Sequence, residues 1–149
     1  MARRYSVAGQ DTNTASTTQI GVTSASTVRP RIYDIICGSD ATPADNSAEY
    51  NLQRYTAAGT STAFTPVALD PADPAALASA GVNHSVEPTY TASAIVLEWA
   101  QNQRATFRWV AAPGGEIVLP ATAANGAGIQ TITVGGSAVN MNFQIYYEE

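Results

Sequence analysis

The stretch of sequence that decides the fold is residues 95–109, IVLEWAQNQRATFRW. Every second residue is apolar from Ile95 to Trp99 and again from Phe107 to Trp109, and the charged residue of each half falls between them. Because side chains alternate between two faces along a strand, each half predicts a β-strand with its aromatic face buried. The polar QNQ run between the halves predicts the turn that joins them.

The same alternation recurs along the rest of the chain. It is found in residues 31–37, 49–56, 129–134 and 141–147. Turn signals separate such segments at Pro113-Gly114-Gly115, at Asn125 to Gly128 and at Gly135-Gly136. Short strands with turns between them predict a mostly β protein, an antiparallel β-sandwich for which a jelly roll is the arrangement considered.

One interruption of the strand pattern has the chemistry of a short helix. Asp73 suits the N-cap, Pro74 the first helical position and Gly81 the position that closes the helix. The alanine-rich run between them favours helix propagation. We therefore expect one short helix or helical turn at residues 73–81.

The N-terminal residues differ in composition from the rest. Within residues 1–18, the stretch 6–18 is rich in Ser, Thr, Asn and Gln and shows no sustained apolar period. This predicts an extended arm that a partner orders. Residues 19–149 are numerous enough for one domain with its own core and are expected to form a single β-sandwich domain. Deletion of residues 2–18 is then expected to leave the fold intact and to weaken attachment.

The composition indicates a largely neutral surface. Only 13% of the residues are charged, 45% are hydrophobic, and lysine is absent. Small neutral residues must cover much of the surface, as in proteins that pack into an assembly. A genome of high GC content gives the same bias, so composition alone does not separate the two causes.

The charge distribution, the apolar runs and the single cysteine limit which partners and sites are expected. The net charge is −5, and apart from the pairs Arg3/Arg4 and Arg29/Arg31 the seven arginines are scattered. Without a basic stripe, nucleic acid is not an expected partner. No apolar run approaches the about 20 residues of a membrane span, and no apolar signal segment follows the N-terminus, so neither a membrane nor ordinary export is expected. Cys37, the only cysteine, is expected to be a small buried hydrophobe.

No constellation of residues predicts catalysis or a cofactor. His84 is the only histidine, and no local motif supports its use in a Ser-His-Asp arrangement. Glu98 and Glu116 lie on predicted strands as a glycosidase pair would, but their alternation with apolar residues places them on solvated faces. Asp70 and Asp73 lack the alternating pattern of a calcium loop. We expect no enzymatic activity, no metal and no cofactor.

The aromatic residues suggest where a partner could bind. Trp99 and Trp109 share strand faces with other apolar residues and are expected in the core. Tyr146 and Tyr147 are adjacent, so one of them must lie on the surface. The candidate partner-interface residues are Arg3, Arg4, Tyr5 and Tyr146. If aromatic rings instead cluster on exposed loops, the alternative is a host-receptor or carbohydrate-binding β-sandwich module.

Several segments read together resemble small structural proteins of tailed bacteriophages. They are RPRIYD at 29–34, ATPADN at 41–46, QRYTAAGT at 53–60, FTPVALDP at 64–71 and FRWVAAPGGE at 107–116. The resemblance spans roughly residues 29 to 147 and carries over no catalytic residue. It implies a virion structural protein, a head decoration protein that staples the major capsid protein lattice.

The same resemblance implies an oligomer and a location. A homo-oligomer, with a trimer as the favoured state, would be made in the host cytoplasm and would sit on the outer capsid surface. The resemblance does not distinguish the head of the particle from its tail.

Overall fold

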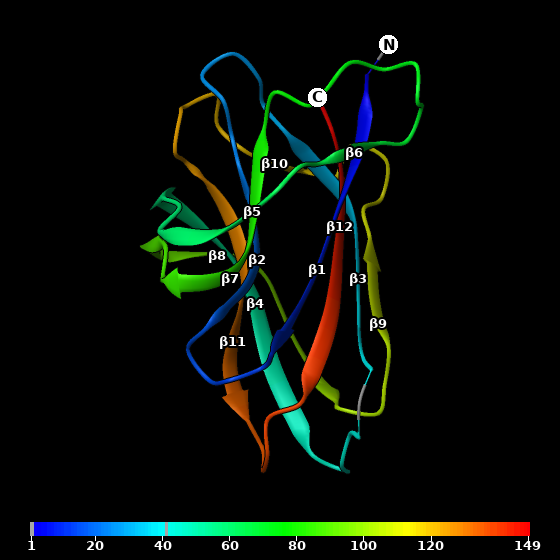
Figure 1. Cartoon of the computed structure of the whole chain (residues 1–149), viewed down its shortest axis with the longest axis vertical. Helices are drawn as coiled ribbons and strands as arrows, with labels where there is room; N and C mark the ends of the chain where they lie inside the picture. The colour runs from blue at the N-terminus through cyan, green and yellow to red at the C-terminus, as the bar shows by residue number, and fades with distance from the viewer. Residues whose placement is uncertain (1, 41) are drawn as a thin grey trace.

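The computed structural model describes residues 2–40 and 42–149. Two antiparallel sheets of six strands pack face to face, and both chain ends lie at the same end of the molecule (Figure 1). The strands are β1 (Arg4–Thr12), β2 (Thr18–Thr23), β3 (Arg31–Ser39), β4 (Ser47–Ala57), β5 (Thr60–Phe64), β6 (Val67–Ala68), β7 (Ser79–Val86), β8 (Thr89–Asn102), β9 (Phe107–Val110), β10 (Ile117–Val118), β11 (Gly126–Val134) and β12 (Asn140–Glu148). The predicted β-sandwich is confirmed. No helix among the described residues is long and apolar enough to cross a membrane.

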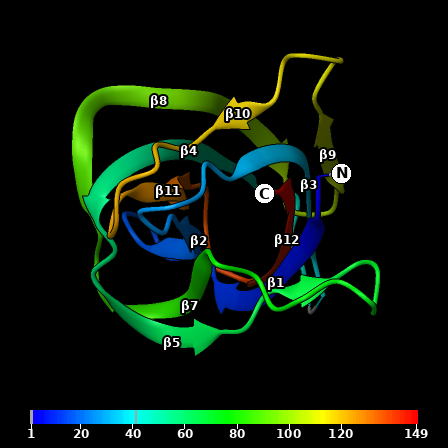
Figure 2. The same cartoon turned by 90° about the horizontal axis from the view of Figure 1, so that it is seen from above.

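The connectivity is that of a jelly roll. The first sheet has the order β10-β3-β12-β1-β6, with β9 also paired to β3, and the second has the order β5-β7-β2-β11-β4-β8. Figure 2 shows β1, β3 and β12 on one side of the molecule and β2, β4 and β11 on the other. Strands β1-β12-β3-β9 and β2-β11-β4-β8 thus form the two four-stranded halves of a double-sheet jelly roll, to which β5, β6, β7 and β10 are added.

The core fills the space between the sheets. Its largest buried side chains include Tyr5, Ile32, Ile35, Met141, Phe143, Ile145 and Tyr147 from the first sheet and Ile20, Tyr50, Leu52 and Ile129 from the second. Cys37 is buried among them, as predicted, and its thiol donates to Gln101 Oε1 at 3.2 Å. Aromatic pairs cross the core, such as Tyr50 against Phe143 with ring centroids 5.5 Å apart.

The N-terminal arm is the largest difference from the sequence prediction. Residues 4–12 form β1, which lies inside the first sheet between β12 and β6. Tyr5 and Val7 point into the core with 0% exposure. Two inward apolar residues are too few to give a recognisable period, and the pairing partner of β1 is the far end of the chain, so composition alone suggested an arm.

The predicted helix at 73–81 is not confirmed. Asp73 closes a turn by donating its N–H to the Asp70 carbonyl at 3.0 Å, and Gly81 lies in β7. Between them, the N–H groups of Leu77 and Ala78 donate to the Glu149 carboxylate at 3.0 and 2.7 Å. Backbone donors that a helix would use internally are thus taken by the end of the chain.

A β-bulge changes which residues of β3 face the core. Along β12, Tyr146 and Tyr147 pair with Asp34 and Ile32, which leaves Tyr33 as an extra residue. As a result Ile32 is wholly buried and Tyr33 lies half-buried on the outer face. Uninterrupted alternation predicts the reverse orientation for these two residues.

The turn predicted at residues 125–128 lies just before them, where the Asn125 N–H donates to the Thr122 carbonyl at 3.2 Å, and residues 126–128 are already in a strand. Strand β11 begins at Gly126, directly after Asn125. The ring of Tyr55 lies over Gly126, where an added Cβ would be 2.6 Å from the ring. The Tyr90 hydroxyl lies similarly close, at 2.8 Å from a Cβ added to Gly128. These glycines make room for tyrosines on the outer face of the second sheet.

The decisive stretch at 95–109 crosses from one sheet to the other. Trp99 is buried at the end of β8 and stacks on Phe107 of β9, with ring centroids 4.6 Å apart and planes at 5°. The turn falls just after the predicted position, at residues 102–105, where the Ala105 N–H donates to the Asn102 carbonyl. Ile95 is 44% exposed, since β8 is an edge strand and extends past the core there.

Candidate functional site

The first exposed surface of interest surrounds the two chain ends. Residues 65–78, here called the strap, run along the edge of β1 through β6, where Ala68 pairs with Tyr5 and the Leu69 N–H donates to the Arg4 carbonyl at 2.9 Å. The C-terminal end lies on the other side of β1, because Arg3 and Glu149 exchange two backbone hydrogen bonds. The strap and both chain ends therefore form one continuous surface.

The strap is fixed in place although most of it is exposed. The buried Tyr5 hydroxyl donates to the Pro74 carbonyl at 3.0 Å. The Glu149 carboxylate holds two strap N–H groups, as described above. Burial, followed by the negative charge of Glu149, raises the pKa of Tyr5, so this hydroxyl stays protonated and keeps its donor role.

This surface combines exposed apolar side chains with charges of both signs. Val67, Leu69 and Leu77 are 56%, 48% and 56% exposed. A cleft of about 660 Å³ is lined by Leu69 together with two arginines, Arg3 and Arg4, and two aspartates, Asp70 and Asp73. We call this surface the terminal patch and define it by Arg3, Arg4, Val67, Leu69, Asp70, Asp73 and Leu77. Exposed apolar side chains rimmed by charges are typical of a protein interaction site.

The structure separates the four predicted interface residues. Arg3 and Arg4 are exposed and line the terminal patch. Tyr5 is wholly buried, so it is corrected from an interface residue to a core residue. Side chains alternate along β1, so Tyr5 faces the core while Arg4 and Ser6 on either side of it face outward. Tyr146 is half-buried on the outer face of the first sheet, away from the core.

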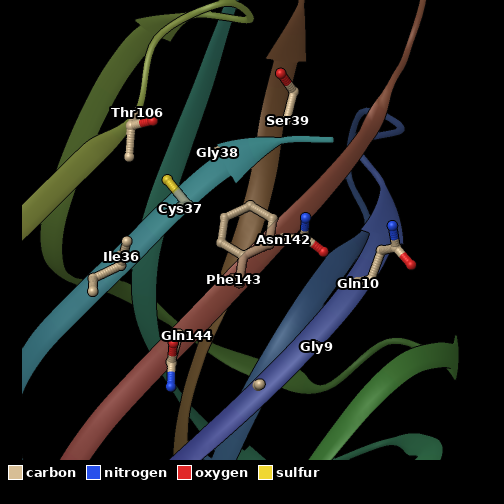
Figure 3. A pocket seen from close by; sticks show the side chains of 11 residues that line it. Gly9, Gln10, Ile36, Cys37, Gly38, Ser39, Thr106, Asn142, Phe143 and Gln144 are labelled. Carbon is tan, nitrogen blue, oxygen red and sulfur yellow. The ribbon is translucent and has the colours of Figure 1, made fainter. Parts of the chain in front are cut away.

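The second exposed surface is a groove on the outer face of the first sheet, which we call the outer-face groove. It has a volume of about 540 Å³ and runs across β1, β12 and β3 (Figure 3). Its polar side chains come from Gln10, Ser39, Thr106, Asn142 and Gln144. The sequence contains a signal for this polar surface, since Asn142 and Gln144 alternate with the buried residues of β12. The alternation does not show that a hollow lies beside these two side chains.

Aromatic and ionic contacts lie beyond one end of this groove. The rings of Tyr33 and Tyr146 are 6.3 Å apart, and the Arg4 guanidinium lies 5.7 Å from the Tyr33 ring centroid. Arg108 donates to both carboxylate oxygens of Asp34, through Nε at 3.1 Å and Nη2 at 2.6 Å. The pair holds the exposed Arg108 side chain against the sheet.

The residues considered for catalysis come from separate strands and do not gather into one site. Burial lowers the pKa of His84, which lies on β7 of the second sheet. Glu98 lies on β8 of the second sheet, and Glu116 precedes β10 of the first, where it pairs with Arg31 at 2.8 Å. Burial raises the pKa of the Cys37 thiol to about 12, which makes a reactive thiolate unfavourable at neutral pH.

The acidic residues of the strap do not gather with other metal ligands. Asp70 accepts the Ala72 N–H at 2.9 Å in a tight turn, and its carbonyl accepts the Asp73 N–H. Within residues 2–40 and 42–149, no three His, Cys, Asp or Glu side chains are grouped as metal ligands. These aspartates therefore have a structural explanation as turn residues.

Comparison with known proteins does not assign the chain to a family. No protein-family model matches the sequence, and searches of curated proteins and of solved structures gave no significant match.

Proposed function

We propose that the chain is a virion structural protein, a decoration protein that binds the major capsid protein lattice of a tailed bacteriophage through the terminal patch. The observation that carries the proposal is the exposure of Val67, Leu69 and Leu77 along the hydrogen-bonded strap of a protein with little charge. The sequence resemblance to small phage structural proteins supplies the class of particle.

A partner that covers the terminal patch removes its exposed apolar side chains from water, which is favourable. Burying the exposed part of each of its three apolar side chains is favourable by roughly 1 kcal/mol, given about 25 cal/mol per Å². The strap is already held by Tyr5 and Glu149, so little conformational entropy is lost on binding. The charges of both signs at the cleft favour one orientation of the partner.

The proposal extends to location and assembly. A decoration protein sits on the outer capsid surface after synthesis in the host cytoplasm, and it contacts several capsid subunits at once. A homo-oligomer, such as a trimer, would present several terminal patches to the lattice and so increase the avidity of attachment.

The first test is the copy number and position of this protein in purified particles. Quantitative mass spectrometry followed by cryo-electron microscopy is expected to find hundreds of copies at regular lattice positions. A few copies at the tail, or none, would contradict the decoration role.

A matched pair of variants tests the patch itself. Leu77→Ser removes an exposed apolar side chain from the patch, whereas Val86→Ser removes one of nearly equal exposure, 57% against 56%, from β7 of the second sheet. We expect Leu77→Ser to lower particle occupancy and Val86→Ser to leave it unchanged. Equal occupancy of the two variants would show that the terminal patch is not the contact.

A further inference from the structure

We propose that the outer-face groove is a binding site for a neutral, hydroxyl-rich glycan. The groove is distinct from the terminal patch, so this inference does not depend on the capsid attachment proposed above. It gives the protein a second, recognition role on the same sandwich.

The groove presents side-chain amides that can bind sugar hydroxyls. Gln10, Asn142 and Gln144 each present an amide with an acceptor oxygen and two N–H donors. Adjacent hydroxyls of a sugar ring both donate and accept, so a planar amide can bind two of them together. The Gln10 amide donates to the Asp40 carboxylate, which fixes the orientation of this side chain.

The strand register explains why a hollow forms between these amides. Across the β1–β12 pairing, Gln10 lies opposite Asn142 and Ala8 lies opposite Gln144. On the other side of β12, Gly38 lies opposite Asn142. Asn142 and Gln144 thus each have a small residue opposite them, Gly38 and Ala8, so the sheet surface is low beside these two amides.

Two tyrosines lie beyond the groove on the same outer face of the first sheet. Tyr146 follows Gln144 by two residues on the same face of β12, and its ring lies 6.3 Å from that of Tyr33. From Asn142 to Tyr146 the strand rises about 13 Å, which is the scale of a short oligosaccharide. Aromatic rings pack against the C–H faces of sugars, so amides and tyrosines together fit both surfaces of a sugar ring.

The charges select a neutral ligand. No charged side chain among the described residues lines the groove itself, and the Asp40 carboxylate beside it accepts the hydrogen bond from Gln10. The nearest arginines are already engaged, Arg4 above the Tyr33 ring and Arg108 in its two-point contact with Asp34. A phosphate or polyanion would need free cations at the site, and the chain has a net charge of −5.

The test is binding of soluble oligosaccharides to the isolated full-length protein. The probes are maltotriose, cellotriose, chitotriose and mannotriose, with trigalacturonate as the anionic comparison, measured by titration calorimetry and by ligand-observed NMR. We expect at least one neutral trisaccharide to bind and trigalacturonate to bind at least about tenfold more weakly.

Three variants locate the site. Asn142→Ala/Gln144→Ala removes two amides, and loss of their hydrogen bonds is expected to weaken binding about tenfold or more. Ala8→Phe fills the groove without removing a hydrogen-bonding group and is expected to abolish binding. Gln130→Ala removes a half-buried amide from β11 of the other sheet and is expected to have no effect.

The outcomes separate this inference from the proposed function. Absence of binding to all four neutral trisaccharides, stronger binding of the anionic one, or binding that the groove variants leave unchanged would overturn the glycan site. Particle occupancy of the same groove variants is expected to equal that of the unmodified protein. Failure of the glycan site therefore leaves capsid attachment standing, and the reverse also holds.

Discussion

Tyr5 in the first strand stacks on Tyr147 in the last strand, with ring centroids 5.6 Å apart and an interplanar angle of 28°. The two residues are also directly opposite each other in the β1–β12 register, and both are wholly buried. The two ends of the chain are thus joined by an aromatic contact inside the core. Folding of this sandwich requires the chain ends to meet.

Replacement of the buried tyrosine should be far more costly than replacement of an outer one. Tyr5→Ala leaves a cavity in the core and is expected to lower the free energy of unfolding by about 3–5 kcal/mol. Tyr146→Ala, on the outer face, is expected to cost about 1 kcal/mol or less. Urea unfolding followed by tryptophan fluorescence measures both values. Similar losses for the two variants would contradict the placement of Tyr5 in the core.

Removal of the N-terminal residues should unfold the protein. Deletion of residues 2–12 removes β1, which pairs with both β12 and β6, and exposes the core face that Tyr5 and Val7 cover. We expect a chain without cooperative thermal unfolding. Circular dichroism and proton NMR of the truncated protein test this, and a well-dispersed spectrum would restore the idea of a dispensable arm.

Two glycines should respond very differently to alanine. A Cβ added at Gly126 would lie 2.1 Å from the Val22 carbonyl oxygen and 2.6 Å from the Tyr55 ring. We expect Gly126→Ala to destabilise the fold by about 3 kcal/mol or more, because backbone must move. At Gly114, in the turn after Pro113, a Cβ would meet open space, and only the φ of +81° opposes it, at about 1–2 kcal/mol. Thermal unfolding of both variants is the measurement, and equal losses would argue against the close contact.

The stability of the protein should fall at alkaline pH. Burial raises the pKa of Cys37 from 9.0 to about 12 and that of Tyr50 and Tyr55 from 10.0 to about 12. The unfolded chain then loses these protons at lower pH than the folded chain, so the contribution is complete below about pH 9 and is lost progressively up to pH 12. Urea unfolding at pH 8 and pH 11 is expected to show lower stability at pH 11. A flat profile would contradict burial of these groups.

The same burial should protect the thiol from reagents. Cys37 is 1% exposed, and its pKa of about 12 keeps it protonated. We expect Ellman's reagent at pH 8 to react only slowly with the folded protein and at once with the protein in guanidinium chloride. Rapid reaction of the folded form would show that the core opens at β3.

Local patterns predicted the parts of the fold that local physics controls. The turn at Pro113-Gly114-Gly115 is confirmed, with Gly115 donating its N–H to the Ala112 carbonyl at 2.7 Å and Gly114 at a positive φ. Proline fixes one turn position and glycine accepts the other, so neighbours alone decide this conformation. Burial of Trp99 likewise follows from strict alternation along its strand.

Where the structure differs from the sequence prediction, the cause is contact between residues far apart in the chain. The capping residues at 73–81 favour a helix locally, but the Glu149 carboxylate takes the N–H groups of Leu77 and Ala78. The apolar signal of β1 consists of little more than Tyr5 and Val7, and only pairing with β12 makes it a strand. Competition from partners about seventy or more residues away is not visible in a local window.

The two candidate surfaces also combine features that the sequence predicted with features that only the folded structure shows. The exposed arginines of the terminal patch and the surface position of Tyr146 were predicted from the sequence, but the strap beside Arg4 was not. The outer-face groove needed the register of three strands, because its amides and its small residues come from β1, β3 and β12. The sequence of one strand does not show which residues lie opposite it on the neighbouring strands.

The sequence by itself determined that the chain is a β-sandwich, because alternation and turn chemistry are properties of neighbouring residues. The tertiary structure alone decided that the N-terminal segment is a central strand, that the 73–81 segment is extended, and that the outer-face groove exists. Each of these depends on hydrogen bonds and packing between residues far apart in the chain, such as Tyr5 with Tyr147, whose pairing only the folded topology establishes.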